Sequence, residues 1–102
     1  MTFRRAILTH GGAGVDPKHA DGTLAAAEAG MELMANGQSA LDASVHAVRC
    51  LEDDPRFNAG TGSRRRADSR TVQMDASCMA SDGTFGGVTG VEGICNPIDI
   101  AH

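Results

Sequence analysis

A histidine stands directly before a run of small residues near the start of this chain. His10 is followed by Gly11, Gly12, Ala13 and Gly14. Glycine allows the backbone to approach another group closely, and an imidazole can exchange a proton near neutral pH. Such a loop could form the oxyanion hole of a lipase-type hydrolase or bind a phosphate. The chain contains neither the G-x-S-x-G nor the G-x-x-x-x-G-K-[ST] motif of those sites. We expect the loop to face a site and His10 to support it rather than to act as the acid or base.

Three carboxylates stand at the end of a predicted helix, where the helix dipole is negative. They are Glu52, Asp53 and Asp54. The last carbonyl groups of a helix lack donors, so each carboxylate there adds repulsion of a few tenths to about 1 kcal/mol. Two explanations stay open on these residues alone. Either the side chains point into water, or a hard cation lies among the oxygens and offsets the repulsion.

The overall charge and the cysteines restrict the partners. The chain has 102 residues, a formal net charge of −4 and a pI of about 5.4, whereas a nucleic-acid surface is basic. The basic stretch SRRRADSR at 63–70 has no interleaved aromatic residues, so we interpret it as a solvated loop and expect no nucleic-acid partner. No apolar run has the length of a membrane span. The three cysteines lack metal-ligand spacing, which favours reduced thiols in a cytoplasmic protein.

Two helices are expected to position the acidic turn. Apolar residues at helical spacing predict a helix over residues 23–36 and a second from residue 40 to about residue 52. Gly37 favours the end of the first helix and Ser39 caps the second. Residues 15–22 are predicted to form a loop. The side chains expected to be buried are Leu24, Ala27, Met31, Met34, Leu41, Val45 and Val48.

Three strands complete the predicted elements. One is expected over residues 3–9, before the glycine loop, and two more over residues 71–80 and 84–91. The last two flank Ser-Asp-Gly at 81–83, which predicts a β-hairpin. The residues expected on one side of the first hairpin strand are Val72, Met74, Ala76 and Cys78. A strand, a helical hairpin and a β-hairpin in this order predict an α+β fold.

A last helix is expected to start near the end of the sequence. Asn96 could cap it, and Pro97 suits its first position. The sequence ends at His102, within about two helical turns. Because so short a helix does not stabilise itself, we expect the chain to be part of a larger domain.

Four motifs follow one another along the chain, namely THGGAG, LEDDPRFNAGTGS, VQMDASCM and GGVTGVEGICNPIDIA. Together, over residues 6–102, they resemble the opening segment of the plant-type L-asparaginase and isoaspartyl peptidase family. The resemblance implies that residues 1–102 are the N-terminal part of an N-terminal nucleophile hydrolase with a four-layer αββα sandwich.

The resemblance also implies an activity and its partners. Members of this family are made as precursors that cleave themselves and free a threonine, whose hydroxyl attacks the side-chain amide of L-asparagine or a β-aspartyl peptide with the new terminal amine as base. That threonine lies in the second half of the family's sequence, so the isolated chain is expected to be inactive. The expected partners are this small-molecule substrate, the missing C-terminal half and a second αβ unit in a homodimer, with no catalytic cofactor. The alternative is a non-catalytic remnant or a scaffolding subunit.

Individual residues carry the resemblance further. The loop from His10 through Gly11 and Gly12 matches the family's glycine-rich loop beside the active site, and Asn58 matches an asparagine close to the nucleophile. A structural sodium ion is implied by the positions whose backbone carbonyls would hold it, which are Leu51, Glu52, Asp54, Phe57, Ala59 and Thr61. The sequence departs from the family at Arg64, Arg65 and Arg66, where apolar residues are usual.

Overall fold

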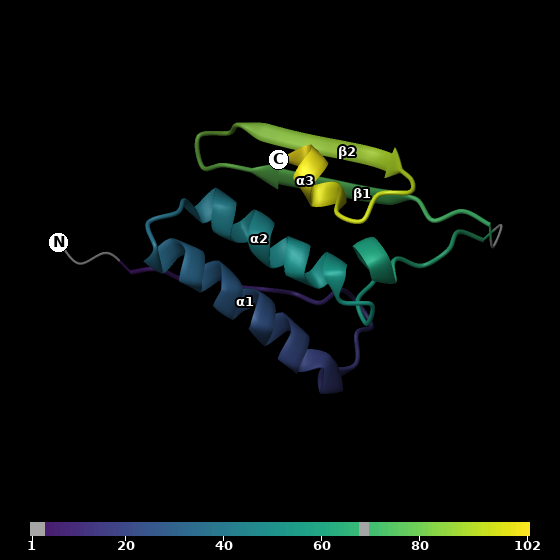
Figure 1. Cartoon of the computed structure of the whole chain (residues 1–102), viewed down its shortest axis with the longest axis horizontal. Helices are drawn as coiled ribbons and strands as arrows, with labels where there is room; N and C mark the ends of the chain where they lie inside the picture. The colour runs from purple at the N-terminus through teal and green to yellow at the C-terminus, as the bar shows by residue number, and fades with distance from the viewer. Residues whose placement is uncertain (1–3, 68–69) are drawn as a thin grey trace.

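The computed structural model describes residues 4–67 and 70–102. Figure 1 shows helices α1 and α2 side by side, with a two-stranded hairpin along the other side of α2. The elements in chain order are the 3-10 turn Pro17–His19, α1 (Ala20–Ala35), α2 (Ala40–Asp53), the 3-10 turn Gly60–Gly62, β1 (Met74–Met79), β2 (Phe85–Val91) and α3 (Pro97–Ala101). The predicted α+β class is confirmed.

The helical hairpin is confirmed, and its caps explain its limits. Gly37 adopts φ +89° after α1, and the Ser39 hydroxyl accepts the backbone N–H of Asp42 at 3.0 Å at the start of α2. The expected loop over residues 15–22 is wrong beyond its first two residues. The Asp16 carboxylate accepts the N–H of Lys18 at 2.9 Å, and Pro17 has the backbone angle of a helix start, so winding begins there.

The buried face of α1 differs from the prediction except at Met34, which is buried as expected. Leu24 is 59% exposed, and Ala27 and Met31 are only partly buried. The buried residues of α1 are Gly22, Ala26, Gly30 and Met34. Small side chains at this spacing let the helix approach its neighbours closely, and this close approach decides which face is buried, rather than the size of the apolar side chains.

Helix α2 meets its expectation in part. Val45 is buried and Leu41 is half-buried, as predicted, but Val48 is on the exposed side. Val45 forms one core cluster with Ile98 and Ala101 of α3. The cluster is completed by half-buried side chains, which are Leu41, Ala76, Cys78 and Val88.

The β-hairpin is confirmed in its pairing and its turn. Strands β1 and β2 are antiparallel, with Met79 opposite Phe85, and Gly83 adopts φ +89° in the connecting turn. Met74, Ala76 and Cys78 face the core, whereas Val72 precedes the strand. The register shifts next to Asp75, whose carboxylate accepts the N–H of Gly90 at 2.8 Å. Gly90 adopts φ +64° there, as a β-bulge requires.

The strand predicted over residues 3–9 is wrong within the described residues 4–9. This segment is extended but pairs with no strand that the structure describes, because β1 and β2 pair only with each other. Its side chains still alternate between partly buried and exposed. Thr9 donates its hydroxyl hydrogen to the Thr23 carbonyl at 2.7 Å, while Leu8 is 96% exposed. Without a partner strand the alternation forms no ladder of hydrogen bonds.

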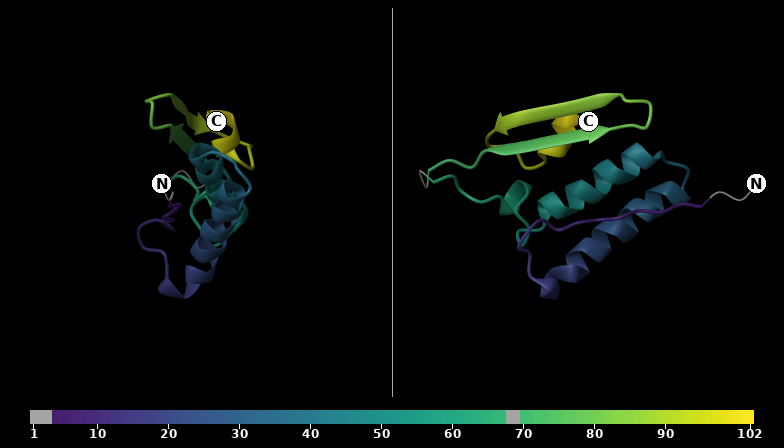
Figure 2. Two further views of the ribbon diagram at one scale, coloured as in Figure 1. Left: turned by 90° about the vertical axis from the view of Figure 1, so that its left-hand side faces the viewer. Right: turned by 180° about the vertical axis from the view of Figure 1, so that it is seen from behind.

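The molecule is thin along its shortest axis. Its extents are 55 × 33 × 19 Å. Seen end-on, the hairpin and the N-terminal segment lie toward one side, and α2 and α3 lie toward the other (Figure 2, left). Within residues 4–67 and 70–102, no helix is both long enough and apolar enough to cross a membrane.

Candidate functional site

The glycine loop is held in shape by its own histidine. Nδ1 of His10 accepts the backbone N–H of Gly12 at 2.9 Å, and the Gly12 carbonyl accepts the N–H of Val15 at 3.4 Å. Gly12 and Gly14 adopt φ of +98° and +77°, which side chains other than glycine rarely allow. The imidazole therefore supports the turn that carries Gly11 and Gly12.

A buried aromatic ring joins this loop to the start of α1 and to the acidic turn. Phe57 is buried, and its ring lies so close to Gly11 and Gly22 that a Cβ at either position would overlap it. The Arg56 guanidinium lies over the same ring, 5.8 Å from its centroid. Phe57 thus places its neighbour Asn58 beside the glycine loop.

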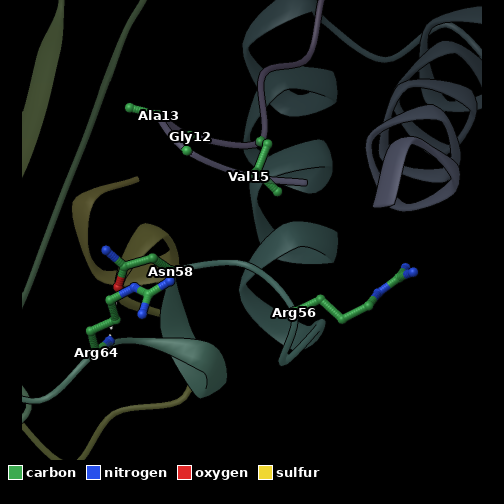
Figure 3. Close-up of a pocket in the computed structure, with 8 residues that line it drawn as sticks. Gly12, Ala13, Val15, Arg56, Asn58 and Arg64 are labelled. Atoms are coloured by element: carbon green, nitrogen blue, oxygen red, sulfur yellow. Dashed lines mark hydrogen bonds between the residues drawn. The ribbon is translucent and has the colours of Figure 1, made fainter. Parts of the chain in front are cut away.

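The loop and the turn enclose a cleft of about 240 Å³ (Figure 3). It brings together three of the residues singled out from sequence, which are Gly11, Gly12 and Asn58. The remaining lining residues are Ala13, Gly14, Val15, Arg56 and Arg64. His10 instead lines an adjoining pocket of about 200 Å³ that shares Gly11 with the cleft.

Arg56 is compensated by two carboxylates. Its Nη1 donates to Asp21 at 2.9 Å and its Nη2 donates to Asp54 at 2.7 Å. Hydrogen bonds from this guanidinium lower the pKa of both carboxyl groups, and they raise the pKa of Arg56 in turn. The result is a clamp between the start of α1 and the end of α2.

Arg64 is the second cation of the cleft, and the sequence interpretation as a solvated loop missed its place. Its backbone N–H donates to Oδ1 of Asn58 at 2.8 Å. The side chain is turned toward Asn58, whereas Arg56 points away from both residues (Figure 3). The run of three arginines at 64–66 is the sequence signal that could have identified it.

The carboxylate side chains of the acidic turn bind donors within the protein. Glu52 is only 2% exposed, and it accepts the backbone N–H of Ile98 at 3.1 Å and the side-chain amide of Asn96 at 3.2 Å. Asp53 accepts the same amide at 2.9 Å, and Asp54 binds Arg56. The buried Glu52 carboxylate thus lies at the start of α3, where a helix N-terminus attracts negative charge.

This arrangement corrects the expected cap of α3 as well. The Asn96 side chain donates to the carboxylates of α2 and accepts no N–H of α3. The acceptor for the backbone N–H of Ile98 in α3 is instead Glu52, which is 44 residues away in sequence from Asn96. Burial raises the pKa of Glu52, and its two hydrogen bonds oppose this rise without cancelling it.

Backbone carbonyls crowd the turn that follows α2. Those of Leu51, Asp54, Phe57 and Ala59 each accept one backbone N–H within the turn, from Asp54, Phe57, Ala59 and Gly62, at 2.9–3.3 Å. A Cβ at Gly62 would lie 2.6 Å from the Pro55 carbonyl oxygen and would collide with that of Phe57, and one at Gly60 would meet the Glu52 carbonyl oxygen. Within the described residues, no three His, Cys, Asp or Glu side chains are placed to hold a metal ion.

Comparison with known proteins covers nearly the whole chain. A family model described as Asparaginase matches residues 4–102. The chain is 45% identical to a plant-type L-asparaginase of Thermococcus kodakarensis over 95% of its length, and 44% identical to another of Pyrococcus abyssi, also over 95%. It is 42% identical to an isoaspartyl peptidase/L-asparaginase of Homo sapiens over 94% of its length. The chain spans 33% of the length of each of these curated relatives.

Proposed function

The chain belongs to the asparaginase family, and from this premise we propose that it forms the N-terminal third of a hydrolase acting on L-asparagine or β-aspartyl dipeptides. The observation that carries the proposal is the similarity to relatives that are plant-type L-asparaginases and isoaspartyl peptidase/L-asparaginases, over 94–95% of this chain. In the complete enzyme a threonine hydroxyl attacks the side-chain carbonyl carbon, the C–N bond breaks, and ammonia or an amino acid leaves with the proton. Water then releases aspartate.

In this proposal the chain supplies a wall of the active site and no nucleophile. The cleft is lined by four consecutive small residues at 11–14 together with Val15, Arg56, Asn58 and Arg64. None of these side chains is a nucleophile or a general base, and no threonine that the structure describes lines the cleft. The backbone N–H groups of the loop and the Asn58 amide position substrate, and the isolated chain is inactive.

The partners in this proposal follow from the family. The chain binds the complementary C-terminal part of the enzyme, and two such αβ units form a homodimer. No catalytic cofactor is required. We place the enzyme in the cytoplasm, because Cys50, Cys78 and Cys95 are free thiols, as a reducing compartment favours.

A sodium ion bound by the turn after α2 is also part of the proposal. The main-chain oxygens crowded there suit a hard cation, and each carbonyl that accepts one N–H keeps a second lone pair. The ligands would be the carbonyls of Leu51, Glu52, Asp54, Phe57, Ala59 and Thr61, and the ion would fix the shape of the turn. The melting temperature should be higher in sodium chloride than in choline chloride at equal ionic strength. Equal melting temperatures in the two salts would refute the binding of sodium by this turn.

The activity is tested by reconstitution. The chain is co-expressed with the part of the Thermococcus kodakarensis asparaginase that remains when its matching third is removed. Ammonia release from L-asparagine and aspartate release from β-aspartylglycine are measured for the pair and for each part alone. We expect hydrolysis by the pair only. Hydrolysis by the chain alone would refute the claim that the chain contains no nucleophile. A purified pair that is inactive on both substrates would refute the proposed function.

A further inference from the structure

The cleft carries one positive charge that the described residues do not compensate. The guanidinium of Arg56 is occupied by Asp21 and Asp54, at 2.9 and 2.7 Å. The ion pairs of the described residues include none for Arg64. Since Arg64 lines the cleft, its charge is available to a ligand.

Asn58 presents a donor at the same place. Its Oδ1 accepts the backbone N–H of Arg64 at 2.8 Å, which fixes the orientation of the amide and leaves its Nδ2 group free to donate to a ligand. Figure 3 shows this nitrogen on the side that faces Gly12 and Ala13. The guanidinium and the amide are both donors, and donors placed beside a positive charge favour an anion.

We propose that Arg64 and Asn58 bind the carboxylate on the leaving side of a β-aspartyl dipeptide, which makes Arg64 the residue that favours dipeptides over L-asparagine. The inference rests on the proposed function. Of its two substrate classes, only the dipeptide carries a further carboxylate, on the amino acid that leaves. A guanidinium fork matches a carboxylate in two parallel hydrogen bonds, which an apolar residue at this position could not provide.

Binding is tested directly on the full chain. N-acetylglycine, which carries the amide and carboxylate of a leaving glycine, is titrated while the NMR amide signals of Gly11, Gly12 and Asn58 are recorded. We expect saturable shifts in the wild type, affinity lower by about tenfold or more in Arg64→Gln, and unchanged affinity in Arg66→Gln. Arg66 is a matched control because it is exposed in the same loop, does not line the cleft and binds Gln73.

Four results of this titration would overturn the inference. They are no saturable shift in the wild type, equal shifts with N-acetylglycinamide, an unchanged affinity in Arg64→Gln, and equal losses in the two variants. Tighter binding of inorganic phosphate than of N-acetylglycine would also overturn it, because the site would then not be built for a carboxylate.

Kinetics of the reconstituted enzyme separate this inference from the proposed function. In Arg64→Gln the KM for β-aspartylglycine should rise about tenfold or more, with little change for L-asparagine or β-aspartylglycinamide. An active enzyme whose preference is unchanged by Arg64→Gln would refute the carboxylate site and leave the function standing. An enzyme inactive on all substrates would refute the function, and the titration would still decide the carboxylate site.

Discussion

Glu52 joins two segments that are far apart in sequence. Its carboxylate holds the start of α3 and the Asn96 side chain against the end of α2. Glu52→Ala leaves the buried N–H of Ile98 without its acceptor and leaves the Asn96 amide with Asp53, so we expect a loss of about 1–3 kcal/mol in the free energy of unfolding. Urea denaturation followed by circular dichroism measures it. Asp53→Ala, at the exposed neighbour, should cost less than about 0.5 kcal/mol, and equal costs would contradict the role of Glu52.

The charge on Glu52 makes this contribution depend on pH. Its pKa in the folded protein is raised above the ordinary value of 4.5, so the folded state binds the proton more tightly than the unfolded state does. Stability relative to Glu52→Gln should therefore be greatest below pH 4.5 and decline as the pH rises through the raised pKa. A stability difference between wild type and Glu52→Gln that grows toward neutral pH would show that burial does not dominate the pKa of this carboxyl group.

Arg56 gives the opposite dependence on pH. Its hydrogen bonds lower the pKa of Asp21 and Asp54 below 3.8. These ion pairs are complete above that pH and are lost as the pH falls through the lowered pKa values. Arg56→Gln should lower the urea midpoint more at pH 7 than at pH 2. Arg5→Gln, which removes an exposed charge, should not reproduce this pattern. An Arg56→Gln effect of equal size at both pH values would contradict the clamp.

The elements differ in how far sequence alone predicts them. The helical hairpin and the β-hairpin follow from local signals, namely Ser39 and Gly37 at the helix limits and the Ser-Asp-Gly turn at 81–83, and these signals act over a few residues. The prediction of a strand over residues 3–9 failed because strand pairing depends on a second segment, which no local pattern specifies. Similarly, the Glu52 cap of α3 spans more than 40 residues of sequence. The family motifs predicted that the glycine loop and Asn58 lie at a site. The positions of Arg56 and Arg64 in the cleft depend on the geometry of the loops, which the motifs do not specify.

The buried face of α1 allows a direct comparison between the effects of side-chain packing and of helix propensity on stability. Alanine favours a helix over glycine by about 1 kcal/mol, but a Cβ at Gly22 would lie 2.5 Å from the Phe57 ring. Overpacking of this kind costs about 1–3 kcal/mol, so Gly22→Ala should lower stability by up to about 2 kcal/mol in urea denaturation. In a Phe57→Leu background the same change should cost less, because the ring is gone. An increase in stability on Gly22→Ala would show that the ring moves freely, and that it does not fix Asn58.

The whole molecule is thin, with an extent of 19 Å along its shortest axis. The core cluster lies between α2, α3 and the inner face of the hairpin, and the outer face exposes Met79 and Phe85. A further layer of the proposed enzyme would cover this outer face, where two large apolar side chains are exposed beside unpaired strand edges.

Phe85 tests whether the complementary part of the enzyme covers that face. Its side chain is 66% exposed, so Phe85→Asp should leave the circular dichroism spectrum of the chain unchanged. Burying a phenylalanine contributes about 1.5–3 kcal/mol, and an unpaired buried carboxylate costs more. Co-purification with the Thermococcus kodakarensis part should therefore fall by about tenfold or more. Gln38→Asp adds the same charge at an exposed residue between α1 and α2 and should co-purify normally. Equal recovery of both variants would place the contact elsewhere, because a layer that covers Phe85 cannot accept an aspartate there without loss of affinity.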